Sequence, residues 1–309
     1  MNEQSIVNLF CQNCQSPHTA KNAGYRLAAF ARWLEAEHHI TDLEAVTVKH
    51  ILAYKTHLAQ GNLAPASQAR AIETLRSFFR WCHSEGMIDH DPARSVKSPR
   101  AVLNQEPEYL STDETRRLFD ALDPQGRHVA RDRAMLWALA MGLRVGEVVT
   151  LDIADVIPPA AGQPGMSTDI RSAGLRVHGK RSYERMVPLS QAAYTALAAC
   201  VKERGDVAGE SPLFVCRYAG QIDRRLTPRA VEKWFAELVI TVGLPRAKAH
   251  PHAARHGFAT RLLFEGNTPG SLYTVSKLLG HTNLSTTEKY LHLDRRAMRA
   301  AVLADPLAA

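Results

Sequence analysis

Three histidines and two arginines lie within the thirteen residues of HPHAARHGFATRL, residues 250–262. The segment is predicted to be helical, because Pro251 suits the first position of a helix and apolar residues such as Phe258 follow at helical spacing. His252 and Arg255 then share one face of that helix. Both side chains can donate hydrogen bonds to anionic oxygens, so the face is predicted to bind a phosphate group.

Two other interpretations of the same residues were considered. His252 and His256 have the i, i+4 spacing of a zinc-binding helix. The zinc-peptidase pattern needs a glutamate after the first histidine, where this chain has Ala253, and Arg255 would repel a divalent cation. We therefore expect no metal here. An ordinary solvated helix face stays open for these residues taken alone.

The composition indicates a globular protein without a membrane span or secretion signal. The chain has 309 residues, of which 45% are hydrophobic and 22% charged, and its length favours two domains. No apolar run reaches the roughly 18 residues of a membrane helix, and the N-terminus lacks the features of a signal peptide. Five cysteines without framework spacing fit a reducing compartment. We therefore predict a cytoplasmic protein.

The distribution of charge and the positions of the cysteines indicate which kinds of binding partner the chain has. The formal net charge is +7, and residues 1–95 hold nine basic and nine acidic residues, so the whole excess lies after them. This excess of positive charge favours an anionic partner such as nucleic acid. Cys11 and Cys14 form a C-x-x-C motif, but no second ligand pair with matching spacing follows. The sequence therefore predicts neither a metal site nor a cofactor.

The elements that must position the candidate residues are mainly helices. Residues 1–95 are predicted to form a helical domain, residues 96–108 a linker and residues 109–309 a second domain. Alternating apolar and polar residues about Gly179 predict a β-hairpin over 175–189, preceded by a loop over 157–169. The predicted fold is mainly α with one small antiparallel sheet. The predicted helices span residues 21–38, 47–61, 65–86, 131–148, 190–204, 227–243, 271–280 and 285–302, with a further capped start at Ser111 and Glu114.

Four more polar residues occupy positions that an apolar or turn residue could fill. Arg144 is expected to end the buried helix 131–148, and Lys180 to lie at the hairpin tip. His281 follows a helix stop at Gly280, and Tyr290 lies early in the last helix. Each has an ordinary explanation by itself, such as an arginine that offsets the helix dipole or a tyrosine that packs in the core.

Together and in this order, these residues resemble the tyrosine recombinases, the phage-integrase family. The matching segments are GLRVGEVVTLDIADV, VHGKRSYERMVPL, HAARHGFATRLL and LLGHTNLSTTEKYLHL. The resemblance covers about residues 20–300 and includes SFFRWCHSEGMIDHDPA of the N-terminal part. The short chain is most similar to the Xer-type branch, whose members resemble XerC and XerD. This implies an N-terminal SAM-like core-binding domain before a C-terminal catalytic domain.

The resemblance also implies a mechanism. Tyr290 would attack a DNA phosphodiester and form a 3′-phosphotyrosyl bond, which conserves the bond energy, and a Holliday junction would follow. Arg144 and Arg255 would clamp the phosphate, because a guanidinium presents fixed donors and does not deprotonate. His252 would act as acid or base, Lys180 would protonate the departing 5′-oxygen, and His281 would donate a hydrogen bond to the phosphate. No cofactor is needed.

The partners that follow are double-stranded DNA sites and other recombinase subunits. The family acts as a homo-tetramer, or as a hetero-tetramer with a related recombinase. For groove contact in the N-terminal domain we selected the third of its predicted helices, with Arg70, Arg76 and Arg80. A solvated surface is the alternative for these three arginines.

Two other functions share part of this pattern. A type IB topoisomerase has the same nicking and closing chemistry without pairing two sites, and a non-catalytic relative would only bind DNA. The segment LLGH and the N-terminal part favour a recombinase, and a pure DNA-binding protein has no need of Tyr290. The biological role, dimer resolution or integration and excision of a mobile element, stays open at this point.

Overall fold

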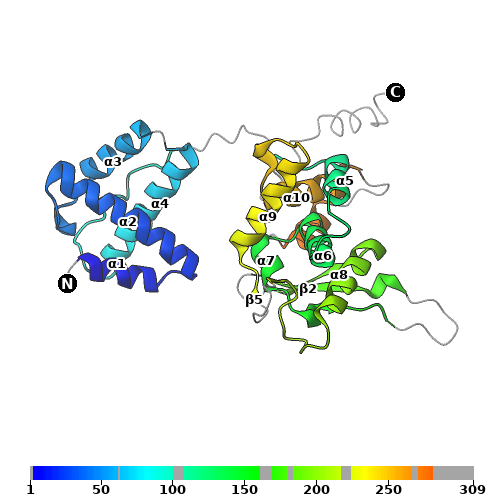
Figure 1. Cartoon of the computed structure of the whole chain (residues 1–309). Helices are drawn as coiled ribbons and strands as arrows, with labels where there is room; N and C mark the ends of the chain where they lie inside the picture. Colours follow the sequence, from blue (N-terminus) through cyan, green and yellow to red (C-terminus); the bar gives the residue numbers. More distant parts are fainter. Residues whose placement is uncertain are drawn as a thin grey trace, which may run out of the picture. The chain divides into compact units, whose positions relative to one another are not determined.

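The chain divides into two compact units, residues 1–105 and 106–309 (Figure 1). The computed structural model describes residues 3–61, 63–99, 108–160, 169–179, 184–216, 224–265 and 271–280. Each unit is built around its own hydrophobic core.

The N-terminal unit consists of helices α1 (Glu3–Gln12), α2 (Pro17–His38), α3 (Val48–Gln60) and α4 (Pro65–Ser84). Ser16 caps α2, where its side chain accepts a hydrogen bond from the Thr19 N–H, and prolines open α2 and α4. The core is aromatic: Phe30 lies edge-on to both Tyr54 and Phe79, at centroid distances of 5.0 and 6.1 Å. The predicted helices 21–38, 47–61 and 65–86 correspond to α2, α3 and α4.

Two features of this unit differ from the sequence-based description. The helix α1 was not predicted, although Ile6 is buried and Phe10 packs edge-on against Phe78 at 5.4 Å. The beginning of the expected linker, residues 96–108, contacts the unit: Val96 is buried in its core, and Lys55 donates a hydrogen bond to the Lys97 carbonyl at 2.8 Å. The packed unit therefore extends past the predicted boundary at residue 95.

The C-terminal unit is mainly helical, with small antiparallel sheets, as the sequence predicted. Its helices are α5 (Thr112–Asp120), α6 (Val129–Ala140), α7 (Val145–Thr150), α8 (Gln191–Arg204), α9 (Pro228–Thr241), α10 (Pro251–Thr260) and α11 (Leu272–Leu279). A three-stranded sheet has the order β1 (Val156–Ile157), β2 (Gly174–His178), β3 (Glu184–Pro188), and β4 (Val215–Cys216) pairs with β5 (Arg224–Arg225). The buried helix α6 packs against α8 at the centre of the core.

The predicted helix 131–148 is wrong in one respect, because the chain breaks in its middle. Gly142 adopts a φ of +84°, a left-handed conformation that favours glycine and ends a helix. A new helix, α7, begins after Arg144, whose backbone N–H is capped by the Glu147 side chain. Arg144 therefore precedes the start of α7 rather than ending the buried helix, and its side chain is presented from a helix N-terminus.

Several local predictions are confirmed. Ser111 and Glu114 form the capping box of α5, Pro251 opens α10, and Gly280 ends α11 with a φ of +64°. The hairpin strands β2 and β3 pair in register from Gly174 opposite Pro188 to His178 opposite Glu184.

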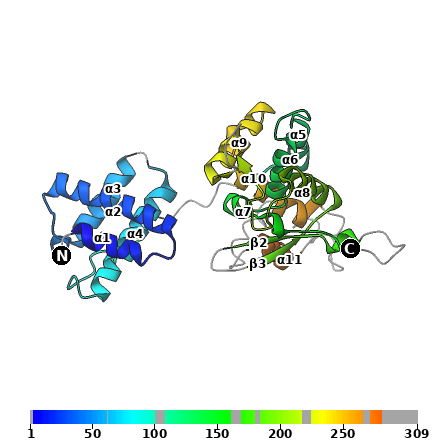
Figure 2. The same ribbon diagram turned by 60° about the horizontal axis from the view of Figure 1, so that its bottom comes forward.

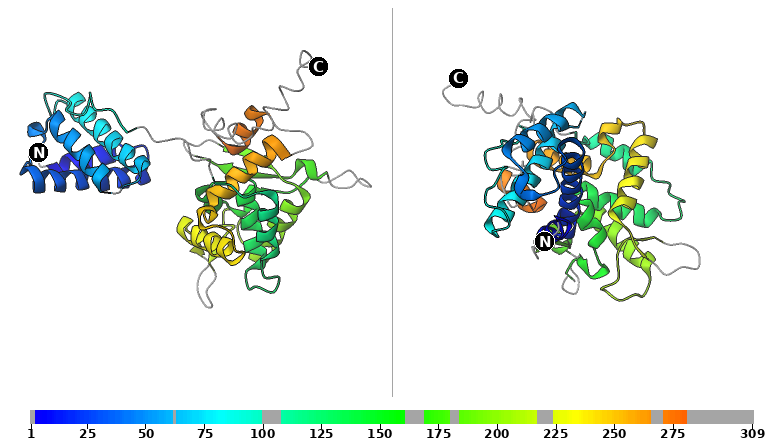
Figure 3. Two further views of the ribbon diagram at one scale, coloured as in Figure 1. Left: turned by 90° about the horizontal axis from the view of Figure 1, so that it is seen from above. Right: turned by 90° about the vertical axis from the view of Figure 1, so that its left-hand side faces the viewer.

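Helix α11 packs against both the hairpin and α10. It contacts β3 (Figure 2), and it lies beside α10 (Figure 3), where Leu279 and Ala259 are buried in a shared apolar cluster. In the part of the chain that the structure describes, no helix is both long and apolar enough to cross a membrane.

Candidate active site

The C-terminal end of α11 is the meeting point of two predicted arginines. Arg144 donates to the Leu279 carbonyl at 3.4 Å and to the Gly280 carbonyl at 3.3 Å. Arg255 donates to the same Leu279 carbonyl at 2.6 Å and also to the Gly142 carbonyl. The last carbonyls of a helix lack partners within the helix and carry partial negative charge, so they attract cationic donors. The structure thus brings together two guanidinium groups from distant parts of the sequence.

Arg144 and Arg255 differ in exposure to solvent. Arg255 is only 3% exposed, held within α10 beneath the surface. The Arg144 side chain is 36% exposed, so part of its guanidinium faces solvent. Its Nη1 atom also donates to Oε1 of Glu147 at 2.8 Å, which fixes its direction. An anion arriving at the surface would meet the exposed edge of Arg144 first.

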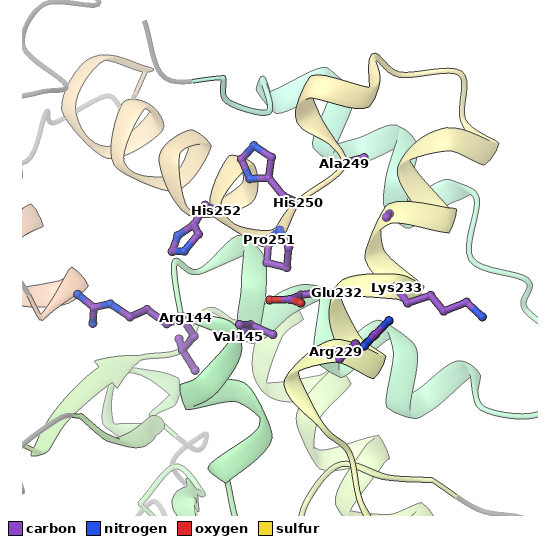
Figure 4. Close-up of a pocket in the computed structure, with 11 residues that line it drawn as sticks. Arg144, Val145, Arg229, Glu232, Lys233, Ala249, His250, Pro251 and His252 are labelled. Carbon is purple, nitrogen blue, oxygen red and sulfur yellow. The ribbon is translucent and has the colours of Figure 1, made fainter. Parts of the chain in front are cut away.

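His252 lies one helical turn before Arg255 on α10, and it lines the same pocket as Arg144. Figure 4 shows its ring between α10 and the Arg144 side chain. The pKa of His252 lies below its ordinary value of 6.5, because surrounding protein atoms desolvate the ring and Arg255 disfavours a second positive charge. The ring is therefore mainly neutral at pH 7, the form in which one nitrogen can accept a proton.

The pocket is a cavity of about 520 Å³ with a cationic lining (Figure 4). Besides Arg144 and His252, sequence reasoning missed three basic lining residues, Arg229 and Lys233 of α9 and His250 at the start of α10. The first two are four residues apart on the exposed face of a helix whose other face is apolar, so the signal was present. Glu232 is the acidic residue of this lining, and the excess of positive charge suits a phosphate-bearing ligand.

Three predicted catalytic residues, Lys180, His281 and Tyr290, lie outside the described residues. Segments next to the first two are described: the hairpin strands β2 and β3 flank the segment that contains Lys180, and Gly280 directly precedes His281. Within the described parts of the chain, no group of three or more His, Cys, Asp or Glu residues could hold a metal ion.

The three arginines selected for groove contact lie on α4 of the N-terminal unit. Arg70 and Arg80 are exposed there. Arg76 is half-buried and donates to Oε1 of Glu73 at 2.9 Å, and Glu73 also accepts a hydrogen bond from Ser98. The structure therefore presents Arg70 and Arg80 to solvent, while Arg76 helps to join α4 to the segment that follows it.

Comparison with known proteins identifies the family of both units. Residues 108–296 match the phage integrase family, and residues 7–86 match the phage integrase N-terminal SAM-like domain. A tyrosine recombinase XerC of Pelotomaculum thermopropionicum is 35% identical over 305 residues, 93% of this chain and 92% of that protein. The tyrosine recombinase XerC of Salmonella typhi is 34% identical over 281 residues, 90% of this chain and 86% of that protein.

The fold is also found in solved structures. The XerH site-specific recombinase, in a post-cleavage complex with a palindromic difH substrate, has a TM-score of 0.72 at 20% identity, covering 93% of this chain and 79% of that one. The family matches of both units and the XerC relatives together define a class of DNA strand-transfer enzymes. The chain belongs to the phage integrase family and is a tyrosine recombinase.

Proposed function

We propose that this recombinase cuts and rejoins double-stranded DNA at specific sites through a phosphotyrosyl bond to Tyr290. The phenol of tyrosine has a pKa near 10, so it deprotonates more readily than an aliphatic alcohol and also leaves more readily. Attack on phosphorus displaces the 5′-oxygen and leaves a 3′-phosphotyrosyl end. Attack by a second DNA strand then reverses the step, so that two rounds of exchange pass through a Holliday junction.

The observation that carries this proposal is the convergence of Arg144 and Arg255 at the end of α11, with His252 in the pocket that Arg144 also lines. The transition state of phosphoryl transfer gathers negative charge on the non-bridging oxygens, and two fixed guanidinium groups can stabilise it. Loss of one such donor typically costs about 10²–10³ in rate. His281 follows this helix end directly in the sequence, and we assign to it a further hydrogen bond to the phosphate.

Proton transfer is assigned to two other side chains. The neutral ring of His252 would accept the proton of Tyr290 during cleavage and return it during rejoining, in line with its lowered pKa. Lys180, between the two hairpin strands, would protonate the departing 5′-oxygen. Neither transfer needs a metal ion or a cofactor.

The partners of this activity are DNA recombination sites and further recombinase subunits. Arg70 and Arg80 are our candidates for DNA contact by the N-terminal unit, with a smaller contribution from Arg76. We expect a tetramer on two sites, formed by four copies of this chain or together with a related recombinase, in the cytoplasm. The XerC relatives favour resolution of DNA dimers over movement of a mobile element as the biological role.

The test is a search for the covalent adduct. The purified full-length protein is incubated with labelled fragments of the source genome that carry random nicks, since a nick near the cleavage site releases the leaving strand and traps the adduct. Wild type and Tyr290→Phe are compared by denaturing gel. An SDS-resistant adduct that is absent from Tyr290→Phe supports the proposal, and its sequence identifies the site.

Two variants test the roles assigned to the arginines, and a third serves as a control. Arg144→Ala and Arg255→Ala should each lower the rate of adduct formation by about 10²–10³. Arg116→Ala, an exposed arginine of α5 paired only with Asp113 among the described residues, should leave the rate unchanged. An adduct that survives in Tyr290→Phe, or cleavage that needs an added divalent metal and leaves free ends, would contradict the proposal.

A further inference from the structure

Arg185 occupies a core position of strand β3. The burial of this strand alternates, and Arg185 and Val187 face inward while Met186, between them, is 51% exposed. A strand with one buried face normally places its apolar residues inward, so a charged residue inside and a methionine outside reverse the expected order. Arg185 is 8% exposed as a residue, and burial of a charge at this level needs compensating partners.

The partners of Arg185 come from two other elements of the candidate active site. Its Nη1 and Nη2 atoms donate to Oε1 and Oε2 of Glu147 on α7, at 3.0 and 2.9 Å. Its Nε atom donates to the Leu278 carbonyl near the end of α11, at 2.8 Å. A single planar guanidinium thus ties β3, α7 and α11 together.

Glu147 passes this constraint on to Arg144. Its Oε1 atom accepts from Nη1 of Arg144 at 2.8 Å, and its Oε2 atom accepts from the Arg144 backbone N–H at 2.8 Å. Each carboxylate oxygen therefore receives one bond from Arg144 and one from Arg185. Burial opposes the charge of Glu147, but the hydrogen bonds from Arg185 and from the Arg144 backbone outweigh it, so the pKa of Glu147 lies below its ordinary value.

The contact between Arg185 and α11 leaves little room for movement. A Cβ atom at Gly280 would lie 2.9 Å from Nη1 of Arg185 and 3.2 Å from its Cζ atom. The guanidinium therefore lies directly against the residue that ends α11 and that precedes His281 in the sequence. Three consecutive carbonyls, at Leu278, Leu279 and Gly280, accept hydrogen bonds from Arg185, Arg255 and Arg144.

We propose that Arg185 is a positioning residue of the recombinase: through Glu147 and the end of α11 it sets the direction in which Arg144 meets the DNA phosphate. This inference rests on the phosphate-binding role proposed for Arg144. Arg185 itself is buried behind Glu147 and does not contact the substrate. A displacement of a catalytic group by about 1 Å can cost about 100-fold in rate, so loss of the bidentate contact should act at this level.

Lysine cannot replace this arginine. A lysine presents one ammonium group, which can bind one carboxylate oxygen or the Leu278 carbonyl but cannot match both oxygens of Glu147 in parallel. The charge is kept in Arg185→Lys, while the geometry is lost. This substitution therefore separates positioning from simple neutralisation of Glu147.

The experiment compares Arg185→Lys with wild type on the nicked DNA fragment recovered from the Tyr290 adduct. Saturating single-turnover adduct formation, DNA affinity by fluorescence anisotropy and thermal unfolding of the full-length chain are measured for each. We expect the saturating rate to fall about 100-fold while the affinity changes by less than about threefold, because Arg144 is misdirected at the transition state rather than lost from the surface. Glu147→Gln should have the same pattern.

Arg204→Lys is the matched control. Arg204 of α8 is also 8% exposed and also donates its Nε atom to a backbone carbonyl, that of Pro212 at 3.1 Å, on a different element from Glu147, Arg144 and α11. Arg204→Lys should lower the unfolding temperature about as much as Arg185→Lys does, while its saturating rate stays within about twofold of wild type. A double-mutant cycle adds the specific readout: Arg185→Lys should cost little further rate in an Arg144→Lys background, because its effect passes through Arg144.

The outcomes separate this inference from the proposed function. No adduct in wild type, or an adduct that persists in Tyr290→Phe, refutes the phosphotyrosyl chemistry and the inference with it. A Tyr290-dependent adduct that forms at the wild-type rate in Arg185→Lys refutes the inference alone, as does a fully additive double-mutant cycle. Loss of the folded catalytic unit in both Arg185→Lys and Glu147→Gln also overturns it, because the pair would then serve only the fold.

Discussion

Whether Gly257→Ala in α10 stabilises or destabilises the protein depends on one close contact. A glycine inside a helix normally costs about 1 kcal/mol relative to alanine, so Gly→Ala at such a position usually stabilises. At Gly257, however, a Cβ atom would lie 2.2 Å from the Leu110 carbonyl oxygen. The Leu110 N–H also donates to the Ala253 carbonyl of the same helix at 3.1 Å, so the chain entering the catalytic unit runs directly along α10.

The expected cost of Gly257→Ala follows from this geometry. The Leu110 backbone must move by about 1 Å to reach an ordinary contact distance, which costs about 1–3 kcal/mol for the overpacked contact and about 1 kcal/mol for the weakened hydrogen bond. Against a gain of about 1 kcal/mol in helix propensity, the net destabilisation is about 1–3 kcal/mol. For a unit of this size, the unfolding temperature should fall by about 2–4 °C for each kcal/mol.

The measurement is differential scanning calorimetry of the full-length chain. The matched control is Gly146→Ala. Gly146 lies within α7, and among the described residues no atom beyond its chain neighbours and the backbone of its own helix is within 4 Å of the added Cβ, so this variant should be neutral or more stable by up to about 1 kcal/mol. If Gly257→Ala raised the unfolding temperature as much as Gly146→Ala, the close packing of Leu110 on α10 would be refuted.

Three further predictions concern the site and the DNA surface. The rate of adduct formation at low DNA concentration should fall on acidification with a midpoint below pH 6.5, because the pKa of His252 is lowered and its neutral form accepts the proton. His252→Gln should remove this acidic limb, and a fall centred above pH 6.5 would contradict the assignment. Arg70→Ala combined with Arg80→Ala should reduce the salt dependence of DNA affinity by about two phosphate contacts, measured by anisotropy over a salt series, and an unchanged slope would exclude both side chains. Gly280→Ala should destabilise the catalytic unit by at least about 1 kcal/mol in chemical denaturation, because a φ of +64° is unfavourable for alanine and its Cβ would meet Arg185.

Local rules predicted much of the fold. Capping residues such as Ser111 and Thr227 mark helix starts in the sequence, and the structure has these starts where they were expected. The hairpin was recognisable because its strands alternate about a turn. Helix α1 was missed because it is short, and it gains its stability from packing against α4 rather than from its own sequence signals.

The break between α6 and α7 shows a limit of periodicity. The apolar pattern continues through Met141 and Leu143, which are both buried, so nothing in the spacing ends the helix there. The decisive residue is Gly142, where a Cβ would meet Phe258 and Leu279 at 2.6 and 2.8 Å. That restriction comes from segments more than a hundred residues away, and it places Arg144 at the beginning of a helix.

Resemblance to the family identified Arg144, His252 and Arg255, but residues that act on them were not predicted. Neither Glu147 nor Arg185 was singled out from the sequence, because sequence alone does not state which face of a strand is buried. A charged residue in step with Val187 and Leu189, with Met186 out of step, was the available signal.

The end of α11 explains how several guanidinium groups can be held close together. Arg144, Arg185 and Arg255 carry three positive charges, which Glu147 and the roughly half negative charge of a helix C-terminus offset in part. Glu147 pairs with both Arg144 and Arg185, and of these two arginines it is Arg144 whose side chain is exposed to an arriving anion. A phosphate carries a full negative charge and forms stronger hydrogen bonds than a peptide carbonyl. It can therefore replace the long contacts of Arg144 with Leu279 and Gly280, while Glu147 and Arg185 continue to hold that side chain in place.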